Sequence, residues 1–334
     1  MLTRRKLLQT TMAAQAALIL PAGCAYKTPL ASGPWVNDIH SKLNRTPVRW
    51  IHRPTSTEAL QAIVRDADRA GRYLSIAGGR HAMGGQQFVT DGDLVDTTAM
   101  DRVVRFDRDA GLIEVGAGIQ WPGLFDWLVA AQAGDPRPWT FRQKQTGADR
   151  LSIGGALAAN VHGRGLTFKP FIADIESFVL VGADGEARRC SRRENPELFA
   201  LAVGGYGLFG AVATVTLRLV PRRKVERVVE IADADGVADA FAERIAAGYL
   251  YGDFQFSTDQ ASDGFLRSGV FSCYRPVDDA TSIPTDQRRL SAEDWTDLLY
   301  LGHADRARAY ERYADYYLTT SGQVYWSDSQ QMST

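Results

Sequence analysis

The chain has 334 residues, of which 45% are hydrophobic and 23% are charged, and its 38 basic and 39 acidic side chains leave a net charge of −1. This length allows two domains of ordinary size, and the near-zero net charge excludes a general attraction to nucleic acid or to acidic membranes. The three cysteines show neither the spacing of a zinc site nor the density of a disulfide scaffold, so Cys190 and Cys273 are expected to be free thiols, with a bond between them as the alternative.

The first thirty residues have the features of an export signal. Arg4 and Arg5 precede an apolar stretch at 12–20 that is too short to cross a bilayer comfortably. This arrangement resembles a twin-arginine signal, and residues 21–24 resemble a lipoprotein processing site in which proline replaces the usual aliphatic residue. Residues 1–30 therefore predict export to the periplasm and make Cys24 a candidate for lipidation. A membrane anchor that is never cleaved is the alternative.

Helix and strand signals alternate after this leader. Thr55 and Glu58 have the spacing of a capping box, and the apolar positions after them predict a helix that Gly71 ends. Residues 73–77 then read as a short buried strand. Further strands are predicted at 94–96, 103–106 and 112–115, and a further helix begins near Pro122.

A glycine-rich loop that contains a histidine follows the strand at 73–77. Its residues 78–86 read GGRHAMGGQ. The four glycines allow positive φ and leave no Cβ in the way, so consecutive N–H groups can converge on an anion, and Arg80 adds a fixed positive charge. His81 is then a candidate for binding or bonding the rest of a phosphate-bearing cofactor. The alternative is an ordinary turn in which His81 is a hydrogen-bonded polar residue.

Two further glycine clusters follow. Residues 151–163 are rich in small side chains, which lets the backbone pack closely against another helix or a ring system. Residues 205–210 match the GxGxxG pattern of dinucleotide-binding folds, but the alternating residues at 214–219 predict a strand after them instead of a helix. We therefore reject a Rossmann site. HExxH, paired CxxC and the P-loop pattern are absent from the sequence, so it gives no support for a metal site or for nucleotide hydrolysis.

Taken in this order, the three glycine clusters resemble those of the vanillyl-alcohol-oxidase superfamily of FAD-linked oxidases, which includes aldonolactone oxidases, alditol oxidases, cytokinin dehydrogenases and decaprenylphosphoryl-ribose oxidases. The resemblance covers residues 45–222 and implies an α+β fold with a PCMH-type, two-subdomain FAD-binding domain. It also implies that residues 78–86 wrap the pyrophosphate and that His81 matches the histidine often joined to the flavin 8α-methyl group. Because no cysteine stands between residues 140 and 165, a single bond through His81 is expected, with noncovalent FAD as the alternative.

The resemblance implies a set of cofactor-binding residues within the three clusters. They are Gly78, Gly79, Arg80, His81, Ala82, Met83, Gly84, Gly85, Gln86, Gly147, Ser152, Ile153, Gly154, Gly155, Ala158, Asn160, His162, Gly163, Gly207, Gly210 and Val212.

Residues 223–334 read as an α+β substrate domain. The resemblance implies that only part of this domain is present, because substrate domains of this family usually continue further. Strands are predicted at 251–257 and 269–274, and helices at 292–301 and 307–318. Residues 322–328 read as a strand entering a site, with Tyr325 and Asp328 as catalytic or substrate-contacting candidates. The alternative is that the aromatic residues of this run belong to a core or an interface.

The implied reaction is oxidation of a CH–OH carbon of a sugar, aldonolactone or polyol-like substrate, in which hydride passes to the flavin and electrons go on to oxygen or a quinone-type acceptor. Two other classes stay open: a noncatalytic flavin-binding protein, and an exported sugar- or lactone-binding protein without flavin.

Overall fold

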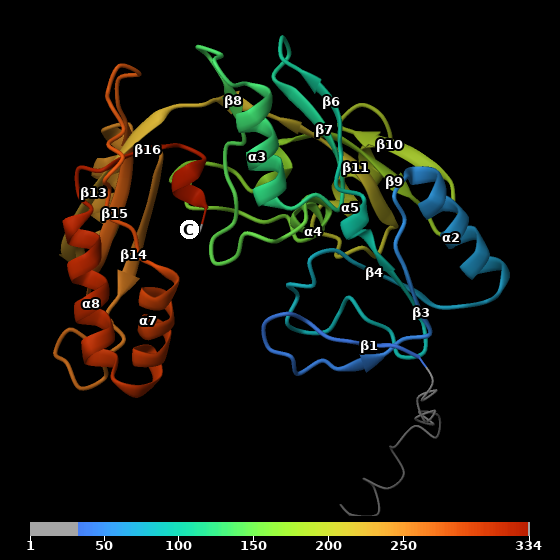
Figure 1. Ribbon diagram of the computed structural model, residues 1–334, viewed down its shortest axis with the longest axis horizontal. Coiled ribbons are helices and arrows are strands. Elements are labelled where there is room, and N and C mark those ends of the chain that lie inside the picture. Colours follow the sequence, from blue (N-terminus) through green and yellow to red (C-terminus); the bar gives the residue numbers. More distant parts are fainter. Residues whose placement is uncertain (1–32, 333–334) are drawn as a thin grey trace, which may run out of the picture.

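Two lobes lie side by side in the computed structural model, which describes residues 33–332 (Figure 1). Helices and sheets are mixed in both lobes, as the α+β prediction requires. The expected export signal at 1–30, with Cys24, lies outside the described residues. Within the described part of the chain, no helix combines the length and the apolar character that a membrane span needs.

The first lobe opens with a small parallel sheet that has the strand order β3-β5-β4. The helix before β4 begins one residue later than the capping-box spacing predicts, because Ser56 is the N-cap and its side chain accepts a hydrogen bond from the N–H of Ala59. Gly71, with φ of 62°, follows the helix end as expected. The elements are β1 (Trp35–Val36), β2 (Thr46–Pro47), β3 (Trp50–His52), α2 (Thr57–Arg69), β4 (Leu74–Ala77) and β5 (Asp93–Asp96).

A five-stranded antiparallel sheet with the order β10-β9-β11-β7-β6 completes this lobe. The α2 helix packs on it through Leu60 and Val64, which share a buried cluster with Val181 and Ala211. The larger apolar core lies between this sheet and the helices α3, α4 and α5. The elements are β6 (Val103–Asp107), β7 (Leu112–Gly116), α3 (Trp121–Ala131), β8 (Trp139–Thr140), α4 (Ile153–Ala158), β9 (Ile175–Val181), β10 (Ala187–Ser191), α5 (Pro196–Ala202), β11 (Ala211–Arg218) and β12 (Val220–Pro221).

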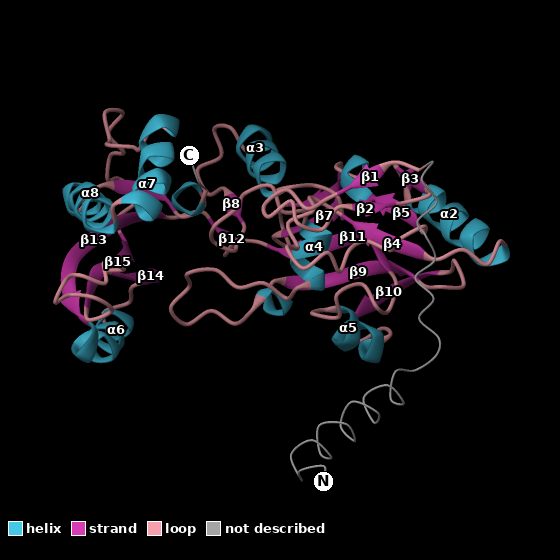
Figure 2. Cartoon of the chain, turned by 90° about the horizontal axis from the view of Figure 1, so that it is seen from below, coloured by secondary structure: helices cyan, strands magenta, loops and turns pink. Residues whose placement is uncertain are grey.

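The second lobe is built on a four-stranded antiparallel sheet with the order β14-β15-β13-β16. Figure 2 shows α6 on one face of this sheet and α7 and α8 on the other. Tyr251 joins the lobes, because it forms a β-bridge with Gly165 and its hydroxyl donates to the carbonyl of Arg142 at 2.8 Å. The elements are β13 (Lys224–Asp233), α6 (Val237–Ala246), β14 (Tyr251–Phe256), β15 (Ser268–Pro276), α7 (Ala292–Ala304), α8 (Arg306–Thr319) and β16 (Val324–Trp326).

The third glycine cluster leads directly into a strand. Residues 205–210 form a turn, and β11 starts at Ala211 with no helix between them. The rejection of a Rossmann site is therefore confirmed. Cys190 and Cys273 are both free and buried, which confirms that prediction as well.

Candidate functional site

A cavity of about 280 Å³ lies at the carboxyl end of β4, where the three glycine-rich segments meet. The end of β4 and the glycine loop, with residues 76–82, 86 and 87, supply most of its wall. Residues 151, 152, 155, 158 and 159 supply a second side, and Tyr206 comes from the third segment. Residues more than a hundred positions apart thus converge on one site. The predicted cofactor residues in this wall are Gly78, Gly79, Arg80, His81, Ala82, Gln86, Ser152, Gly155 and Ala158.

A second cavity, of about 330 Å³, adjoins the first and shares Ile76 with it. Its wall includes Gly207 and Gly210 of the third segment, the end of β9 with residues 182–183, and side chains of α2. The two cavities together offer an elongated path for one ligand. A phosphate-bearing group would lie beside the glycine loop, and its far end would lie against the third segment.

Close packing against a side chain and a carbonyl group explains two of the loop's glycines. A Cβ at Gly78 would lie 2.0 Å from Oγ of Ser152, and a Cβ at Gly79 would lie 2.3 Å from the carbonyl oxygen of Arg150. The expectation of positive φ was correct for only one of the loop's four glycines, Gly85, with φ of 72°. Arg80 adopts the left-handed conformation instead, with φ of 56°.

The backbone of the glycine loop is open to a ligand. Within the described part of the chain, the N–H groups of residues 79–82 donate no hydrogen bond. Backbone N–H groups rarely stay unpaired away from water, and successive free ones are the typical lining of a phosphate site. Arg80 makes no ion pair with another described residue, so its charge is also free for an anion. The loop thus fits a pyrophosphate.

His81 pairs with a second histidine. Its Nδ1 lies 2.7 Å from Nε2 of His40, and the ring centroids are 4.8 Å apart. The other ring nitrogen, Nε2, is buried, and the backbone of Arg150 is a hydrogen-bond partner of the ring on a side away from His40. Burial lowers the pKa of His81 below its ordinary value of 6.5, the backbone of Arg150 opposes this shift, and His40 adds to it. His81 is therefore held neutral at physiological pH.

The loop that carries His40 is fastened by Asp38. This carboxylate is buried and accepts hydrogen bonds from the N–H groups of His40 and Ser41, from the Ser41 hydroxyl and from the Asn44 side chain. Burial opposes ionisation of Asp38, but the hydrogen bonds from Asn44, Ser41 and the backbone outweigh it and hold its pKa well below the usual range. Residues 38–44 thus form a rigid brace beside the glycine loop.

Ten of the predicted cofactor residues line neither cavity. Asn160 and Gly163 serve the local fold, since Oδ1 of Asn160 accepts from the N–H of Ile172 and the N–H of Gly163 donates to Gln143. Ile153 is fully buried in the apolar core, and Val212 packs against that core. The full set is Met83, Gly84, Gly85, Gly147, Ile153, Gly154, Asn160, His162, Gly163 and Val212.

Sequence reasoning missed Tyr206 and Lys144. Tyr206 is 65% exposed at the mouth of the first cavity and has φ of 51°; the signal was an aromatic residue between two glycines. Lys144 has a fully buried side chain that pairs with Asp149 at 2.7 Å and donates to the carbonyls of Gln145 and Ala148. It thereby fixes the loop that leads into the second glycine segment.

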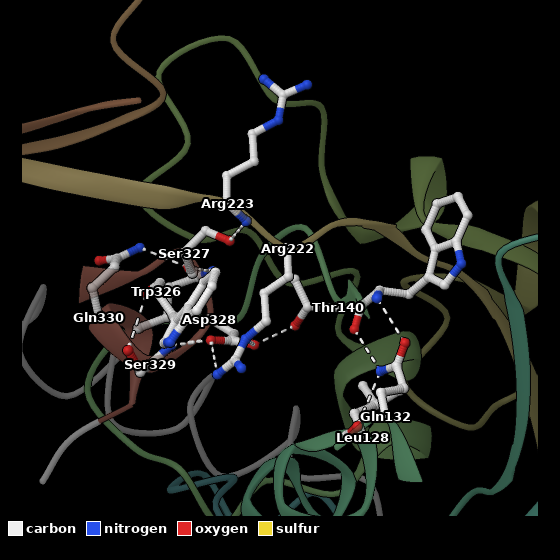
Figure 3. A network of polar contacts seen from close by, with 12 residues as sticks. Leu128, Gln132, Thr140, Arg222, Arg223, Trp326, Ser327, Asp328, Ser329 and Gln330 are labelled. Carbon is white, nitrogen blue, oxygen red and sulfur yellow. Dashed lines mark hydrogen bonds and ion pairs between the residues drawn. The ribbon is translucent and has the colours of Figure 1, made fainter. Parts of the chain in front are cut away.

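The catalytic candidates Tyr325 and Asp328 lie outside the wall of the first cavity. Figure 3 shows the carboxylate of Asp328 facing Arg222 and Thr140. Nε of Arg222 donates to it at 2.7 Å and Oγ1 of Thr140 at 2.8 Å, and only 1% of Asp328 is exposed. The Tyr325 hydroxyl donates to Gln323 at 2.5 Å, and burial raises the pKa of Tyr325 to about 12. These contacts give both residues a structural role in the present geometry.

A wider cavity of about 590 Å³ opens beside Gln120 and Arg150. Its wall contains Arg102 and Trp127 but no residue of the glycine loop at 78–86. Size alone would favour it as the site. The smaller pair of cavities is the better candidate, because the glycine segments, the open amides and the histidine pair meet there.

Comparison with known proteins identifies the first lobe. Residues 48–191 match the family described as FAD binding domain. Residues 48–191 of this chain therefore form an FAD-binding domain, as the resemblance to the vanillyl-alcohol-oxidase superfamily implies. The FAD-binding domain includes β3, β4 and the glycine loop, and also the second glycine segment and β9.

Relatives of the FAD-binding domain are oxidoreductases. The chain is 32% identical over 171 residues to an L-gulono-1,4-lactone dehydrogenase of Mycobacterium tuberculosis, a match that covers 51% of this chain and 37% of the relative. L-gulonolactone oxidase of Mus musculus is 25% identical over 171 residues, with the same coverage. Cytokinin dehydrogenase 2 of Arabidopsis thaliana is 29% identical over 174 residues, which cover 51% of this chain and 33% of the relative. The chain thus spans about a third of the length of these relatives.

Proposed function

We propose that this protein is an FAD-dependent oxidoreductase that oxidises a CH–OH carbon of a sugar, aldonolactone or polyol-like substrate and passes electrons to oxygen or a quinone-type acceptor. The lactone oxidases and dehydrogenases among its relatives support the substrate class. The observation that carries the proposal is the pair of adjoining cavities between the three glycine segments.

The residues present fit FAD. The free N–H groups of residues 79–82 and the unpaired Arg80 suit its pyrophosphate, and the second cavity suits its adenosine end. His81 would hold the flavin by a single covalent bond, since the neighbouring wall contains no cysteine. When bound, the flavin supplies a hydride acceptor. The protein's part is to orient it, to neutralise its phosphates and to keep the His81 ring neutral.

Absorption and acid precipitation test this proposal. The purified full-length protein should show flavin absorption bands, and flavin fluorescence should stay in the acid-precipitated pellet. In the His81→Ala variant, flavin should be released into the supernatant. A folded wild-type protein that binds no added FAD would overturn the proposal, whereas bound but fully extractable FAD would overturn only the covalent bond.

Substrate class needs a separate measurement. Reduction of the enzyme-bound flavin should be followed anaerobically with aldonolactones, polyols and sugars, because bleaching of the flavin bands reports hydride transfer without depending on the electron acceptor. Bleaching by an amine but by none of these alcohols would contradict the proposed substrate class.

A further inference from the structure

The wider cavity of about 590 Å³ contains charged groups that the fold itself does not use. Arg102, directly before β6, and Arg150, before α4, both line it. Neither guanidinium makes an ion pair or a hydrogen bond with another residue in the described part of the chain. Asp101 is the one acidic residue in this wall, so two arginines against one aspartate leave an excess of positive charge. Unpaired arginines of this kind bind carboxylates, sulfonates and phosphates.

The same wall also offers apolar surface. Trp127, Ile119 and Val103 line the cavity together with Pro122. The Trp127 ring is oriented by Phe106, which it meets edge-to-face with the centroids 5.6 Å apart. The cavity has the volume of an ordinary small-molecule site. Ring surface next to unpaired arginines fits a flat aromatic molecule that carries a negative charge.

Only a thin layer of residues separates this cavity from the proposed flavin site. A Cβ at Gly79 would lie 2.3 Å from the carbonyl oxygen of Arg150 and 3.3 Å from Nε2 of Gln120, and both of these residues line the wider cavity. The backbone of Arg150 is also a hydrogen-bond partner of the His81 ring. Gly79 and His81 line the first cavity. A ligand in the wider cavity would therefore lie close to the flavin but outside the space that holds it.

We propose that the wider cavity binds the electron acceptor of this protein, and that the acceptor is an aromatic organic anion of the quinone type. This inference rests on the proposed function and deepens it, because that function leaves the choice between oxygen and a quinone open. Dioxygen is uncharged and has no use for unpaired arginines. In the net reaction the CH–OH group loses two electrons and two protons and becomes a carbonyl group, and the quinone takes them up and becomes a hydroquinone, with the flavin as carrier.

Equilibrium dialysis of the full-length protein tests the binding without any flavin chemistry. Anthraquinone sulfonate is the anionic probe, and hydroxymethyl anthraquinone, which has the same rings and no charge, is its matched comparison. Wild type should bind the anion about tenfold more tightly than the uncharged probe, as one charge-assisted contact predicts. Gluconate, an anion without an aromatic ring, should bind about tenfold more weakly than anthraquinone sulfonate because it leaves the apolar wall uncovered.

Substitutions in the wall give changes of opposite sign. Arg102→Gln and Arg150→Gln should each weaken binding of anthraquinone sulfonate about tenfold and leave binding of the uncharged probe unchanged. Asp101→Asn should strengthen binding of the anion, because a like charge is removed. Arg193→Gln is the matched control, since Arg193 is exposed and lies outside the cavity wall. It should bind both probes as wild type does.

Reoxidation of the flavin-loaded protein tests the acceptor role. The flavin is reduced by light in the absence of oxygen and then mixed with dichlorophenolindophenol, an anionic quinone-type acceptor whose colour reports its reduction. The rate should saturate with acceptor concentration in wild type. In Arg102→Gln the concentration for half-maximal rate should rise about tenfold with the limiting rate unchanged. Reoxidation by uncharged benzoquinone or by dioxygen should be the same in variant and wild type.

The outcomes separate the inference from the proposed function. Equal affinity of wild type for the charged and the uncharged anthraquinone, or for gluconate, would overturn the ligand class. Loss of anion binding in both arginine variants with unchanged reoxidation by dichlorophenolindophenol would overturn the acceptor role and leave the FAD-dependent function standing. A folded protein that binds no FAD would overturn the function and the acceptor role together. Weaker anion binding in both variants, with slower reoxidation by the anionic acceptor alone, supports the proposal.

Discussion

The glycine loop at 78–86 and the segment at 327–331 are both rich in polar groups. The two regions differ in whether those groups are hydrogen-bonded within the protein. In the segment, Asp328 is buried and meets Arg222 and Thr140 within hydrogen-bonding distance. In the loop, successive N–H groups have no partner among the described residues. Polar atoms that are hydrogen-bonded within the protein stabilise the fold, whereas unpaired ones are available to bind a ligand. The difference separates the site from the scaffold better than residue type does.

The largest effect should come from breaking the paired region. Asp328→Ala leaves the half-buried Arg222 without its carboxylate, which should cost about 3–5 kcal/mol of unfolding free energy because an uncompensated charge stays in a poorly hydrated place. Denaturant unfolding measures this loss. Asp126→Ala, an exposed aspartate on α3, is the control. A variant as stable as wild type would mean that the Asp328 network is not structural.

A smaller loss is expected where the two glycine segments touch. In Gly78→Ala the new methyl group would meet Ser152 and push the glycine loop away from the second glycine segment. This displacement should cost about 1–3 kcal/mol of stability and weaken FAD binding. Thermal unfolding with and without FAD measures both effects. Gly84→Ala is the matched control, because its methyl group would meet only the flexible end of Gln86. Equal effects of the two substitutions would contradict the close-contact explanation.

Arg80 should show opposite effects on stability and on binding. Arg80→Gly relieves the left-handed backbone, so the flavin-free protein should gain about 1 kcal/mol at most. FAD affinity should fall nevertheless, because a positive charge beside the phosphates is lost. Arg102→Gly, at a position with ordinary φ, should instead lose stability. Calorimetry of FAD binding and denaturant unfolding check the pair of outcomes.

The smallest expected effect is a pH dependence. Because burial holds the pKa of His81 below 6.5 in the folded protein, the unfolded chain takes up this proton first as pH falls through 6.5. His81 therefore lowers the free energy of unfolding as the pH falls below about 6.5. Lowering the pH from about 7.5 to about 5.5 should cost flavin-free wild type more stability than His81→Gln. Equal losses in denaturant melts would show that His81 is not shielded.

Much of the fold could be predicted from the sequence because its signals are periodic. The strands β4, β7 and β15 and the helices α2, α7 and α8 were all expected close to their observed bounds. The α6 helix was missed, since none of its residues is buried and its pattern is weak. The strand β9 was missed because its apolar run is nearly continuous and follows an irregular stretch.

The residues of the candidate site could be predicted where they belong to a local glycine-rich cluster. They could not be predicted where the site depends on contacts between distant segments. Six of the nine residues of the glycine loop, together with Ser152 and Gly207, are found in the cavity walls as expected from their clusters. His40 was missed because its partner stands 41 positions later and no local pattern links the two. The positive φ of Arg80 was missed for a similar reason, since a left-handed arginine depends on the packing around it and not on its own preference.

The contacts of the segment at 327–331 have a consequence for the order in which the protein is made. Its side chains and backbone bind Thr140, the N–H of Lys144 and the guanidinium of Arg164, which stand 188, 187 and 166 positions earlier in the chain. During synthesis these three groups leave the ribosome long before their partners do. The backbone around the second glycine segment therefore stays incompletely braced until residues 327–331 emerge, so we expect the flavin to be captured only after these residues have left the ribosome.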